Sequence, residues 1–502
     1  MRLFPMNLGQ ARTRLVQGGV ALCAATLIAG CGSTYRPVVT PVTPSGPPAQ
    51  PSSYAIVVSA PSPTTPGVFT VIDYSGDTVL AEAPVGNGPL TFTIDELGGT
   101  GYTLNSDGTM TNIPISSSLQ QKNEDYSTLP STADPVNLFS PSAGLYAADL
   151  NGSATDVFSG FPQSFKLSIP VAATPVMIVG PPVSGQRIFA LTQGNVASGV
   201  ACNNSPTTGP IGSADGIERS SNTLSSTIPV GKCPVYGVES ADTKRLFVLN
   251  RGDDTVTVIN NQNNTLDSCT PFVNQNGQTV HCHPTLPLST TAVTASGVTP
   301  PNGTAGMTAS AGPVYAEYVP ATSELVVANY DGNTISVIDV SEDEYGNDSP
   351  TFGTTFTIPV GNNPAAVTVL ADGTRAYTAN QTDQTVTIVD LSSNTVEKTL
   401  PITGHPRTVV STQNSQFGKV YLSAPDSPYL SIIRTDLDIL DTTVLVQGNI
   451  VDVRVTTQTG SSGNVNTTSR RPGYGQPCYL PPALEVSTYG ANYTLADCRI
   501  LP

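Results

Sequence analysis

The sequence has no tryptophan and only three histidines among its 502 residues, and charged residues make up just 12% of it. It also contains no HExxH motif, no Walker-type phosphate loop and no GxSxG motif. These absences exclude the metalloproteases, nucleotidases and serine hydrolases that carry those motifs.

Positive charge is also scarce. There are 21 Lys and Arg residues against 37 Asp and Glu residues, which gives a formal net charge of −16. Such a chain repels nucleic acid, whose binding depends on neutralising phosphates, so we expect no nucleic-acid partner. Turn formers are abundant instead, with 45 Gly and 44 Pro. This composition is typical of an exported, turn-rich β protein.

The first 31 residues form an export signal rather than part of the fold. Arg2, Arg12 and Arg14 give a positive start, and the apolar run Val20–Ala29 is too short for a permanent membrane anchor. The run ends in LIAGC, which resembles a bacterial lipobox with Cys31 as the lipidated residue. The alternative is a plain secretory peptide with a chance cysteine at this position.

The residues after Cys31 indicate where the protein resides. Gly32, rather than Asp, follows the lipidated residue, which implies outer-membrane sorting in Gram-negative lipoproteins. The diacylglyceryl and N-acyl groups of such a lipoprotein give a stable anchor. Residues 32–53 are rich in proline and form an extended linker. We therefore expect a cell-envelope protein, periplasmic or surface-facing, whose first partner is the membrane itself.

Residues 375–411 contain four short strands separated by turns. Val, Ile, Thr and Tyr fill the strands, and Asn, Asp, Ser, Gly and Pro fill the turns. In the strand Thr385–Leu391, Val386 and Ile388 point to one face and Val389 to the other, so both faces must be covered. One unit cannot do this alone, and copies of it must stack.

Copies of the unit are present elsewhere in the chain. The second strand of the unit reads RLFVLN (Arg245–Asn250), ELVVAN (Glu324–Asn329), RAYTAN (Arg375–Asn380) and KVYLSA (Lys419–Ala424). The third reads DTVTVIN, NTISVID, QTVTIVD and YLSIIRT, and the turn into the innermost strand reads VGKCP, VGNNP and TGHP. These stretches resemble the YVTN-type β-propeller repeat, most clearly from about residue 228 to residue 456. The resemblance implies a propeller of the lactonase-like superfamily. The absence of tryptophan removes the Trp-based motifs of WD repeats and of quinone-dependent dehydrogenase propellers.

The repeat predicts an all-β fold, a propeller of four-stranded blades over residues 54–459. Second strands and innermost strands each number eight, so we expect eight blades, with seven as the alternative because the unit at 100–134 is poorly formed. The first unit lacks an innermost strand and the last has a spare one, Ile450–Arg454. Pairing the two closes the ring and removes its free edges. Residues 460–502 form a Gly/Ser-rich, disulfide-pinned C-terminal tail.

Six of the eight cysteines remain once Cys23 leaves with the signal and Cys31 carries lipid. Six cysteines allow fifteen pairings. The local pairing requires the least coincidence, and an oxidising compartment favours it. It joins Cys202 to Cys233, Cys269 to Cys282 and Cys478 to Cys498.

Two clusters are candidate metal sites. His281-Cys282-His283 would need further ligands to hold a metal, and Cys282 already has an expected disulfide partner, so we expect a structural loop without metal. The acidic loop Glu342–Asp348 offers oxygen ligands of the kind that calcium takes, but it lacks EF-hand spacing. We expect a solvated loop and no cofactor, with a calcium ion as the alternative.

Two further candidates fall on turns. Arg251-Gly252-Asp253 spells an adhesion tripeptide but occupies a repeat turn, so we expect a coincidence. His405 and Arg407, at the start of an innermost strand that faces the central channel, are the best candidates for chemistry. The alternative for His405 is an ordinary turn residue, in the place held by Asn363 and Cys233.

These observations favour a binding or scaffolding module at the cell envelope, with an envelope protein or a glycan as partner, and we assign no catalytic residue. A lactonase-like hydrolase that uses the central channel is the first alternative, and a surface adhesion or matrix component is the second. The hydrolase requires charged side chains in the channel. The adhesion protein requires an exposed apolar patch, for which the tyrosines of the tail are candidates.

Overall fold

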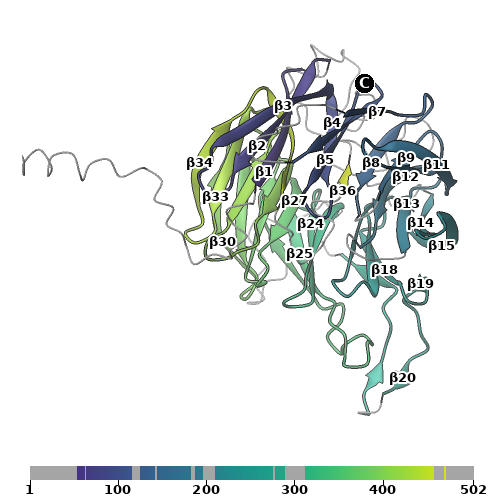
Figure 1. The fold of residues 1–502 in the computed structure, drawn as a ribbon. Helices are drawn as coiled ribbons and strands as arrows, with labels where there is room; N and C mark the ends of the chain where they lie inside the picture. Colours follow the sequence, from purple (N-terminus) through teal and green to yellow (C-terminus); the bar gives the residue numbers. More distant parts are fainter. Residues whose placement is uncertain are drawn as a thin grey trace, which may run out of the picture. The chain divides into compact units, whose positions relative to one another are not determined.

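The computed structural model describes residues 54–62, 64–115, 125–141, 144–181, 187–195, 210–274, 277–288, 311–456 and 468–470. All of them belong to one compact unit, Ser52–Pro502. These residues form strands and turns without any helix, so no helix in the described part could span a membrane. Eight antiparallel sheets form the eight blades of a β-propeller, which confirms the predicted fold (Figure 1).

The strands of the first four blades are given from the innermost outward. Blade 1 is β35 (Asn449–Val455), β1 (Tyr54–Ala60), β2 (Pro66–Asp73) and β3 (Val79–Asn87). Blade 2 is β4 (Pro89–Ile94), β5 (Thr100–Asn105), β6 (Thr109–Pro114) and β7 (Asp125–Thr128). Blade 3 is β8 (Pro135–Phe139), β9 (Leu145–Asp149), β10 (Ala154–Ser159) and β11 (Ser164–Pro170). Blade 4 is β12 (Pro175–Val179), β13 (Arg187–Thr192), β14 (Ile211–Glu218) and β15 (Thr223–Lys232).

The other four blades follow the same order. Blade 5 is β16 (Pro234–Glu239), β17 (Arg245–Asn250), β18 (Thr255–Asn260) and an outermost strand in two pieces, β19 (Thr265–Leu266) and β22 (Thr285–Pro287). Blade 6 is β23 (Pro313–Val319), β24 (Glu324–Asn329), β25 (Thr334–Asp339) and β26 (Thr355–Pro359). Blade 7 is β27 (Pro364–Val369), β28 (Arg375–Asn380), β29 (Thr385–Asp390) and β30 (Thr395–Pro401). Blade 8 is β31 (Thr408–Ser411), β32 (Lys419–Ser423), β33 (Tyr429–Arg434) and β34 (Ile439–Leu445).

The ring closes through β35, as the sequence predicts. β35 pairs antiparallel with β1, with Val57 opposite Val453 and Ile56 opposite Arg454. Each innermost strand contacts the innermost strand of the next blade, including β31 with β35 and β35 with β4, so the circle is complete. The unit at 100–134 contributes a regular blade, and the seven-bladed alternative is therefore wrong.

The repeat motif has a physical basis in a buried asparagine at the end of the second strand. The side-chain nitrogens of Asn250, Asn329 and Asn380 each donate to two hydroxyls on the following strand, at 2.8–3.1 Å. The glycine of the VG turn packs against the same asparagine. A Cβ atom at Gly361 would lie 2.6 Å from Asn380 Nδ2, so only glycine fits there. The asparagine that ends the second strand and the glycine of the VG turn, the two halves of the motif, therefore contact each other.

The apolar core lies between the blades. Val386 and Ile388 belong to the cluster shared with blade 8, whereas Val389 belongs to the cluster shared with blade 6. A strand in the middle of a blade is therefore covered on both faces, as its sequence predicts.

A C-terminal strand enters the ring centre. Residues 468–470 form β36, which pairs antiparallel with the innermost strand β8, with Ser469 opposite Leu138. β36 also contacts β4 and β12, the innermost strands on either side of β8. The ring centre is thus partly lined by the chain's own C-terminal segment, next to blades 2, 3 and 4 (Figure 1).

Candidate functional site

Two insertions leave the propeller at neighbouring blades. The first, residues 267–284, separates β19 from β22 and therefore interrupts the outermost strand of blade 5. It contains the hairpin of β20 (Phe272–Val273) and β21 (Thr279–Val280). The second, residues 340–354, separates β25 from β26 in blade 6. We call these two insertions together the arm. Figure 1 shows β20 standing away from the blades.

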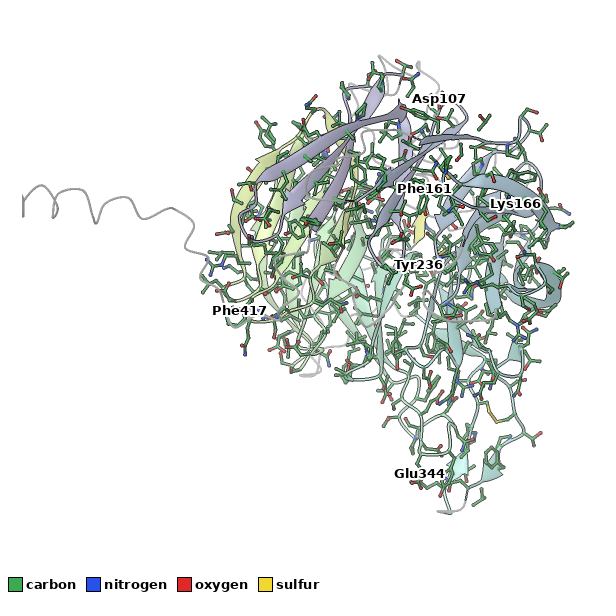
Figure 2. The ribbon with its side chains drawn as sticks, viewed as in Figure 1. Asp107, Phe161, Lys166, Tyr236, Glu344 and Phe417 are labelled. Carbon is green, nitrogen blue, oxygen red and sulfur yellow. A yellow bond between two sulfur atoms is a disulfide. The ribbon has the colours of Figure 1, made fainter. Side chains whose placement is uncertain are left out.

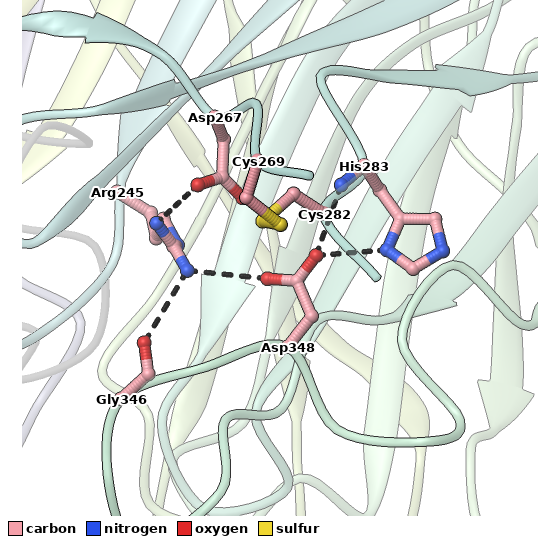
Figure 3. The surroundings of a disulfide bond; sticks show 7 residues. All are labelled: Arg245, Asp267, Cys269, Cys282, His283, Gly346 and Asp348. Carbon is pink, nitrogen blue, oxygen red and sulfur yellow. Dashed lines mark hydrogen bonds and ion pairs between the residues drawn. A yellow bond between two sulfur atoms is a disulfide. The ribbon is translucent and has the colours of Figure 1, made fainter. Parts of the chain in front are cut away.

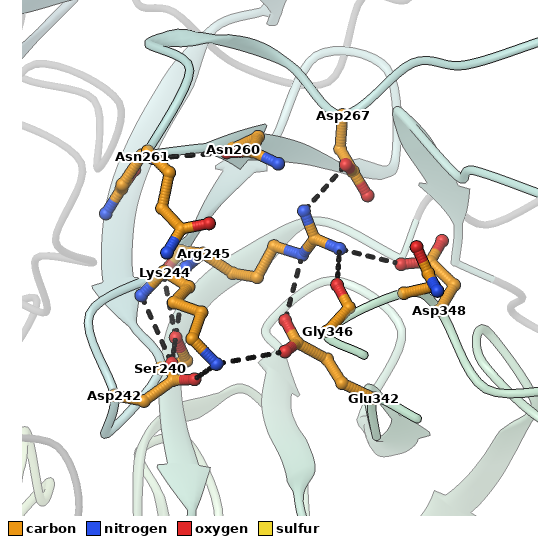
Figure 4. Close-up of polar contacts among 12 residues, drawn as sticks. Ser240, Asp242, Lys244, Arg245, Asn260, Asn261, Asp267, Glu342, Gly346 and Asp348 are labelled. Atoms are coloured by element: carbon orange, nitrogen blue, oxygen red, sulfur yellow. Dashed lines mark hydrogen bonds and ion pairs between the residues drawn. The ribbon is translucent and has the colours of Figure 1, made fainter. Parts of the chain in front are cut away.

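Arg245, the first residue of β17, holds the arm together (Figure 4). Its side chain is almost completely buried, with 4% of the residue exposed. Nη1 lies 2.7 Å from Asp267 Oδ1 in the first insertion, and Nη2 lies 3.1 Å from Asp348 Oδ1 in the second. Nε lies 3.2 Å from Glu342 Oε1. One guanidinium therefore bridges both insertions and the blade from which the first one leaves.

The histidine–cysteine cluster lies on the other side of the same carboxylate (Figure 3). Cys269 and Cys282 form a disulfide within the first insertion. His283 Nδ1 lies 2.8 Å from Asp348 Oδ2, which also accepts a hydrogen bond from the His283 backbone N–H at 3.0 Å. The described residues contain no group of three side chains placed to hold a metal ion. The histidine cluster and the acidic loop, two separate candidates in the sequence, are thus parts of one structural contact.

Burial controls the protonation of this cluster. It raises the pKa of Asp267 to about 6, because desolvation and the neighbouring Asp348 outweigh the attraction of Arg245. Burial also raises the pKa of Glu342, against the opposing attraction of Arg245. Asp267 and Glu342 therefore bind protons more readily than exposed carboxylates do.

The acidic loop is ordered by its own contacts. The carboxylate of Asp343 accepts hydrogen bonds from the backbone N–H groups of Tyr345 and Asn347 and from the Asn347 side chain, at 2.9–3.2 Å. The side chain of Asn274, from the first insertion, also hydrogen-bonds Asp343. These donors occupy oxygen atoms that calcium would need. The expected absence of a cofactor stays a prediction, with calcium as its alternative.

The far end of the arm exposes apolar side chains. Phe272 is 42% exposed, Val273 65% and Tyr345 50%. Figure 2 places Glu344, the neighbour of Tyr345, at the end of the projection, far from the blades. A short hairpin is unstable on its own, and here the disulfide and the Arg245 contacts hold it. The arm therefore presents apolar groups on a braced support.

The Arg-Gly-Asp tripeptide is engaged within the protein. The Arg251 guanidinium contacts the carboxylate of Asp331 in blade 6 at 3.1–3.3 Å and lies over the Tyr330 ring. Asp253 accepts a hydrogen bond from the Lys232 backbone N–H at 2.5 Å. Arg251 thus connects blade 5 to blade 6, and Asp253 holds the turn into β16. That the match to an adhesion motif is a coincidence stays a prediction.

His405 is also held by its own fold. Its ring nitrogens lie 2.6 Å from Asp426 Oδ2 and 2.9 Å from Gln384 Nε2, and its backbone N–H donates to Asp426 Oδ1 at 2.8 Å. The same backbone contact joins Lys232 to Asp253 and Asn362 to Asp383 in sister blades. His405 therefore matches Lys232 and Asn362, not Cys233 and Asn363 as the sequence comparison predicted, because the turn into β31 is one residue shorter.

The ring centre carries charged and aromatic side chains. Arg407 precedes β31, Asp452 and Arg454 lie on β35, and all three are buried. Tyr236 and Tyr315 stack with their ring centroids 4.6 Å apart. Burial, Tyr236 and Glu317 raise the pKa of Tyr315 far above its usual range, whereas the charge of Arg454 lowers it. The ring centre therefore contains charged and aromatic side chains in addition to small polar ones.

Sequence reasoning missed Arg245, Asp267, Asp452 and Arg454. A signal for Arg245 does exist, because a basic residue also opens the second strand in three sister blades. Arg187 Nη1 donates to Asn261 O at 2.8 Å, Arg375 Nη1 to Thr435 O at 2.6 Å and Lys419 Nζ to Tyr74 O at 2.8 Å, each in the next blade. Arg245 makes the same kind of contact, to the insertion that replaces the turn of blade 6.

The predicted cysteine pairs are described in part. Cys233 is disulfide-bonded, in addition to the Cys269–Cys282 pair. Cys31, Cys202, Cys478 and Cys498 lie outside the described residues, as do the signal peptide and the linker.

No family model matches the sequence, and no curated protein matches it. Solved structures do resemble the fold. One is apo AztD from Citrobacter koseri, with 13% identity and a TM-score of 0.51, covering 82% of this chain and 99% of that one. Another is the dihydro-heme d1 dehydrogenase NirN in complex with DHE, with 13% identity and a TM-score of 0.51, covering 84% of this chain and 79% of that one. At this identity the likeness shows a shared propeller fold, and function must be argued from the site.

Proposed function

We propose that this protein is an exported propeller, lipid-anchored through Cys31, that binds an envelope protein partner through the arm. The observation that carries this proposal is the braced, exposed tip formed by Phe272, Val273 and Tyr345. Exposed apolar groups on a stable support are typical of interaction sites. The repeat motif supports membership of the YVTN-type propellers within the lactonase-like superfamily.

The sequence and one disulfide bond support the proposal of export and anchoring. LIAGC places Cys31 at the end of the apolar run, and the Cys269–Cys282 disulfide is typical of proteins in an oxidising compartment, which supports export. Gly32 supports delivery to the outer membrane. The proline-rich segment 32–53 gives the propeller reach from that surface.

Binding has more support than catalysis. A hydrolase needs a base that can reach the substrate. Both ring nitrogens of His405 are engaged, by Asp426 and Gln384, and His283 belongs to the arm rather than to the ring centre. The charged ring centre is the one observation that favours the lactonase-like alternative. However, the carboxylate of Asp452 in the ring centre already pairs with Arg454, with Arg454 Nη1 at 2.7 Å from Asp452 Oδ1. The adhesion alternative relied on tail tyrosines, which lie outside the described residues.

Anchoring is tested by metabolic labelling with a clickable fatty acid. The wild-type protein should incorporate the label and the variant Cys31→Ala should not. Equal labelling of both proteins would remove the lipoprotein proposal.

Binding is tested by affinity capture from detergent-solubilised envelopes. The double variant Phe272→Ser, Val273→Ser should lose a partner that the wild-type protein captures. Leu97→Ser is the matched control, because Leu97 is an apolar residue with 81% exposure on blade 2, away from the arm. The same partners on all three baits would show that the arm does not bind them.

A further inference from the structure

Arg407 is a buried cation that forms no ion pair among the residues that the structure describes. Only 6% of the residue is exposed. Nη2 donates to the carbonyl oxygen of Val451, and Nε makes no hydrogen bond to any described residue. Within the described residues, no carboxylate lies within ion-pair distance of it. A guanidinium in this setting is strongly unfavourable unless something else satisfies it.

The charged groups near Arg407 are bound to other partners. Arg454 Nη1 lies 2.7 Å from Asp452 Oδ1, and the Val453 backbone N–H donates to the same oxygen at 2.8 Å. The carboxylate of Glu317 is bound elsewhere, by the Val369 backbone N–H at 3.0 Å and by Gln413 Nε2 at 3.1 Å. Asp452 thus pairs with Arg454 and not with Arg407, and neither Asp452 nor Glu317 forms an ion pair with Arg407 among the described residues.

The two arginines come from adjacent blades at the ring centre. Arg407 leads into β31 and Arg454 lies on β35, so the two side chains come from the innermost strands of adjacent blades. Burial and the proximity of Arg454 lower the pKa of Arg407, whereas Asp452 raises it, which places the three groups within electrostatic reach of one another. Arg454 also acts on the hydroxyl of Tyr315, across the ring in blade 6.

We propose that Arg407, together with Arg454, forms a binding site at the ring centre for a small organic anion that bears a carboxylate or a phosphate. A guanidinium presents paired N–H groups that match the oxygens of both anions. A bound oxyanion supplies the missing opposite charge and accepts the hydrogen bond that Nε lacks. This site belongs to the propeller itself and depends neither on lipid at Cys31 nor on the arm.

The test is titration calorimetry on the full-length protein in detergent. Inorganic phosphate and succinate are the probes, and chloride at matched ionic strength is the blank. The wild-type protein should bind at least one probe, and the probe that binds identifies the anion class. Arg407→Met should weaken binding at least tenfold, whereas Arg434→Gln, at an exposed arginine of the same last blade, should stay within twofold.

Arg407→Lys keeps the charge without the paired N–H groups and is the second variant if Arg407→Met does not fold. It should bind several-fold more weakly than the wild-type protein. The proposal is overturned if neither probe binds, or if the methionine or the lysine variant binds as tightly as the wild-type protein. Cys31→Ala should bind as the wild-type protein does, which separates this result from the test of anchoring.

Discussion

Lys419 Nζ lies 2.6 Å from Asp77 Oδ2, although 342 residues separate the two in the chain. The pair joins blade 8 to blade 1, and Tyr74 strengthens the same joint by donating its hydroxyl to the backbone oxygen of Phe417. Arg187 and Arg375 make the corresponding contacts between consecutive blades. The closing joint of the ring is therefore built like the others, and β35 supplies the strand that makes this possible.

Ring closure predicts a difference between two truncations. A chain that ends at Gly448 lacks β35 and leaves β1 as an open edge, whereas one that ends at Thr456 keeps it. Ile450, Val453 and Val455 are fully buried, and each contributes about 1.5–3 kcal/mol of burial. The shorter chain should therefore lose several kcal/mol in urea unfolding followed by circular dichroism. Equal stability of the two truncations would show that β35 does not close the ring.

The arm predicts that Arg245 is essential for stability. Arg245→Met leaves the buried Asp267 and Asp348 without the cation that bridges them, which should cost about 3–5 kcal/mol, whereas Glu342 keeps its contact with Lys244. Lowering the pH to 5 should restore part of this loss, because the pKa values of Asp267 and Glu342 are raised and these two carboxylates take up protons. The control Arg434→Gln removes an exposed ion pair and should change stability by less than about 1 kcal/mol. Urea unfolding at the two pH values measures both effects, and a loss that does not depend on pH would contradict the ionic account.

Asp267 predicts a pH dependence of known sign. Its pKa is about 6 in the folded protein against an ordinary value of 3.8, so the folded state holds the proton more tightly. Its contribution to stability is therefore complete below pH 3.8 and declines as the pH rises to about 6, by at most about 1.4 kcal/mol per pH unit. Asp267→Asn cannot titrate, and its stability should fall less steeply than that of the wild-type protein over this range. Parallel stability curves would mean that Asp267 titrates normally.

The positions of the cysteines predict which of them form disulfide bonds with each other. Peptide mapping without reduction should recover Cys202–Cys233 and Cys478–Cys498 in addition to Cys269–Cys282. Free thiols at Cys269 and Cys282 together with bound zinc would reverse the structural interpretation of the His281 to His283 loop.

Much of the fold was predictable because the blade is a local pattern. The alternation in Thr385–Leu391 and the asparagine at Asn380 recur in blades 5 and 6, where the asparagines are Asn250 and Asn329, and each copy positions its own blade. The spare strand Ile450–Arg454 was found by counting, although its partner β1 lies at the other end of the chain. Local pattern thus sufficed for every blade that repeats the motif.

The candidate site was less predictable because its contacts are not local. Arg245 reaches Asp348 across 103 residues, and neither insertion carries a repeat that would place it. The histidine cluster and the acidic loop were each visible in the sequence, but nothing in either indicated that His283 and Asp348 meet. β36 was missed for the same reason, since Thr468–Arg470 pairs with β8 without any recognisable pattern.

Site-specific photo-crosslinking in living cells tests the central claim most directly. A photoreactive amino acid at position 272, at the tip of the arm, is compared with one at position 97, on blade 2. The account predicts a discrete crosslinked product of higher mass from position 272, its loss when Arg245→Met is added, and no such product from position 97. The absence of a product from position 272, or the same product from both positions, would contradict a binding role for the arm.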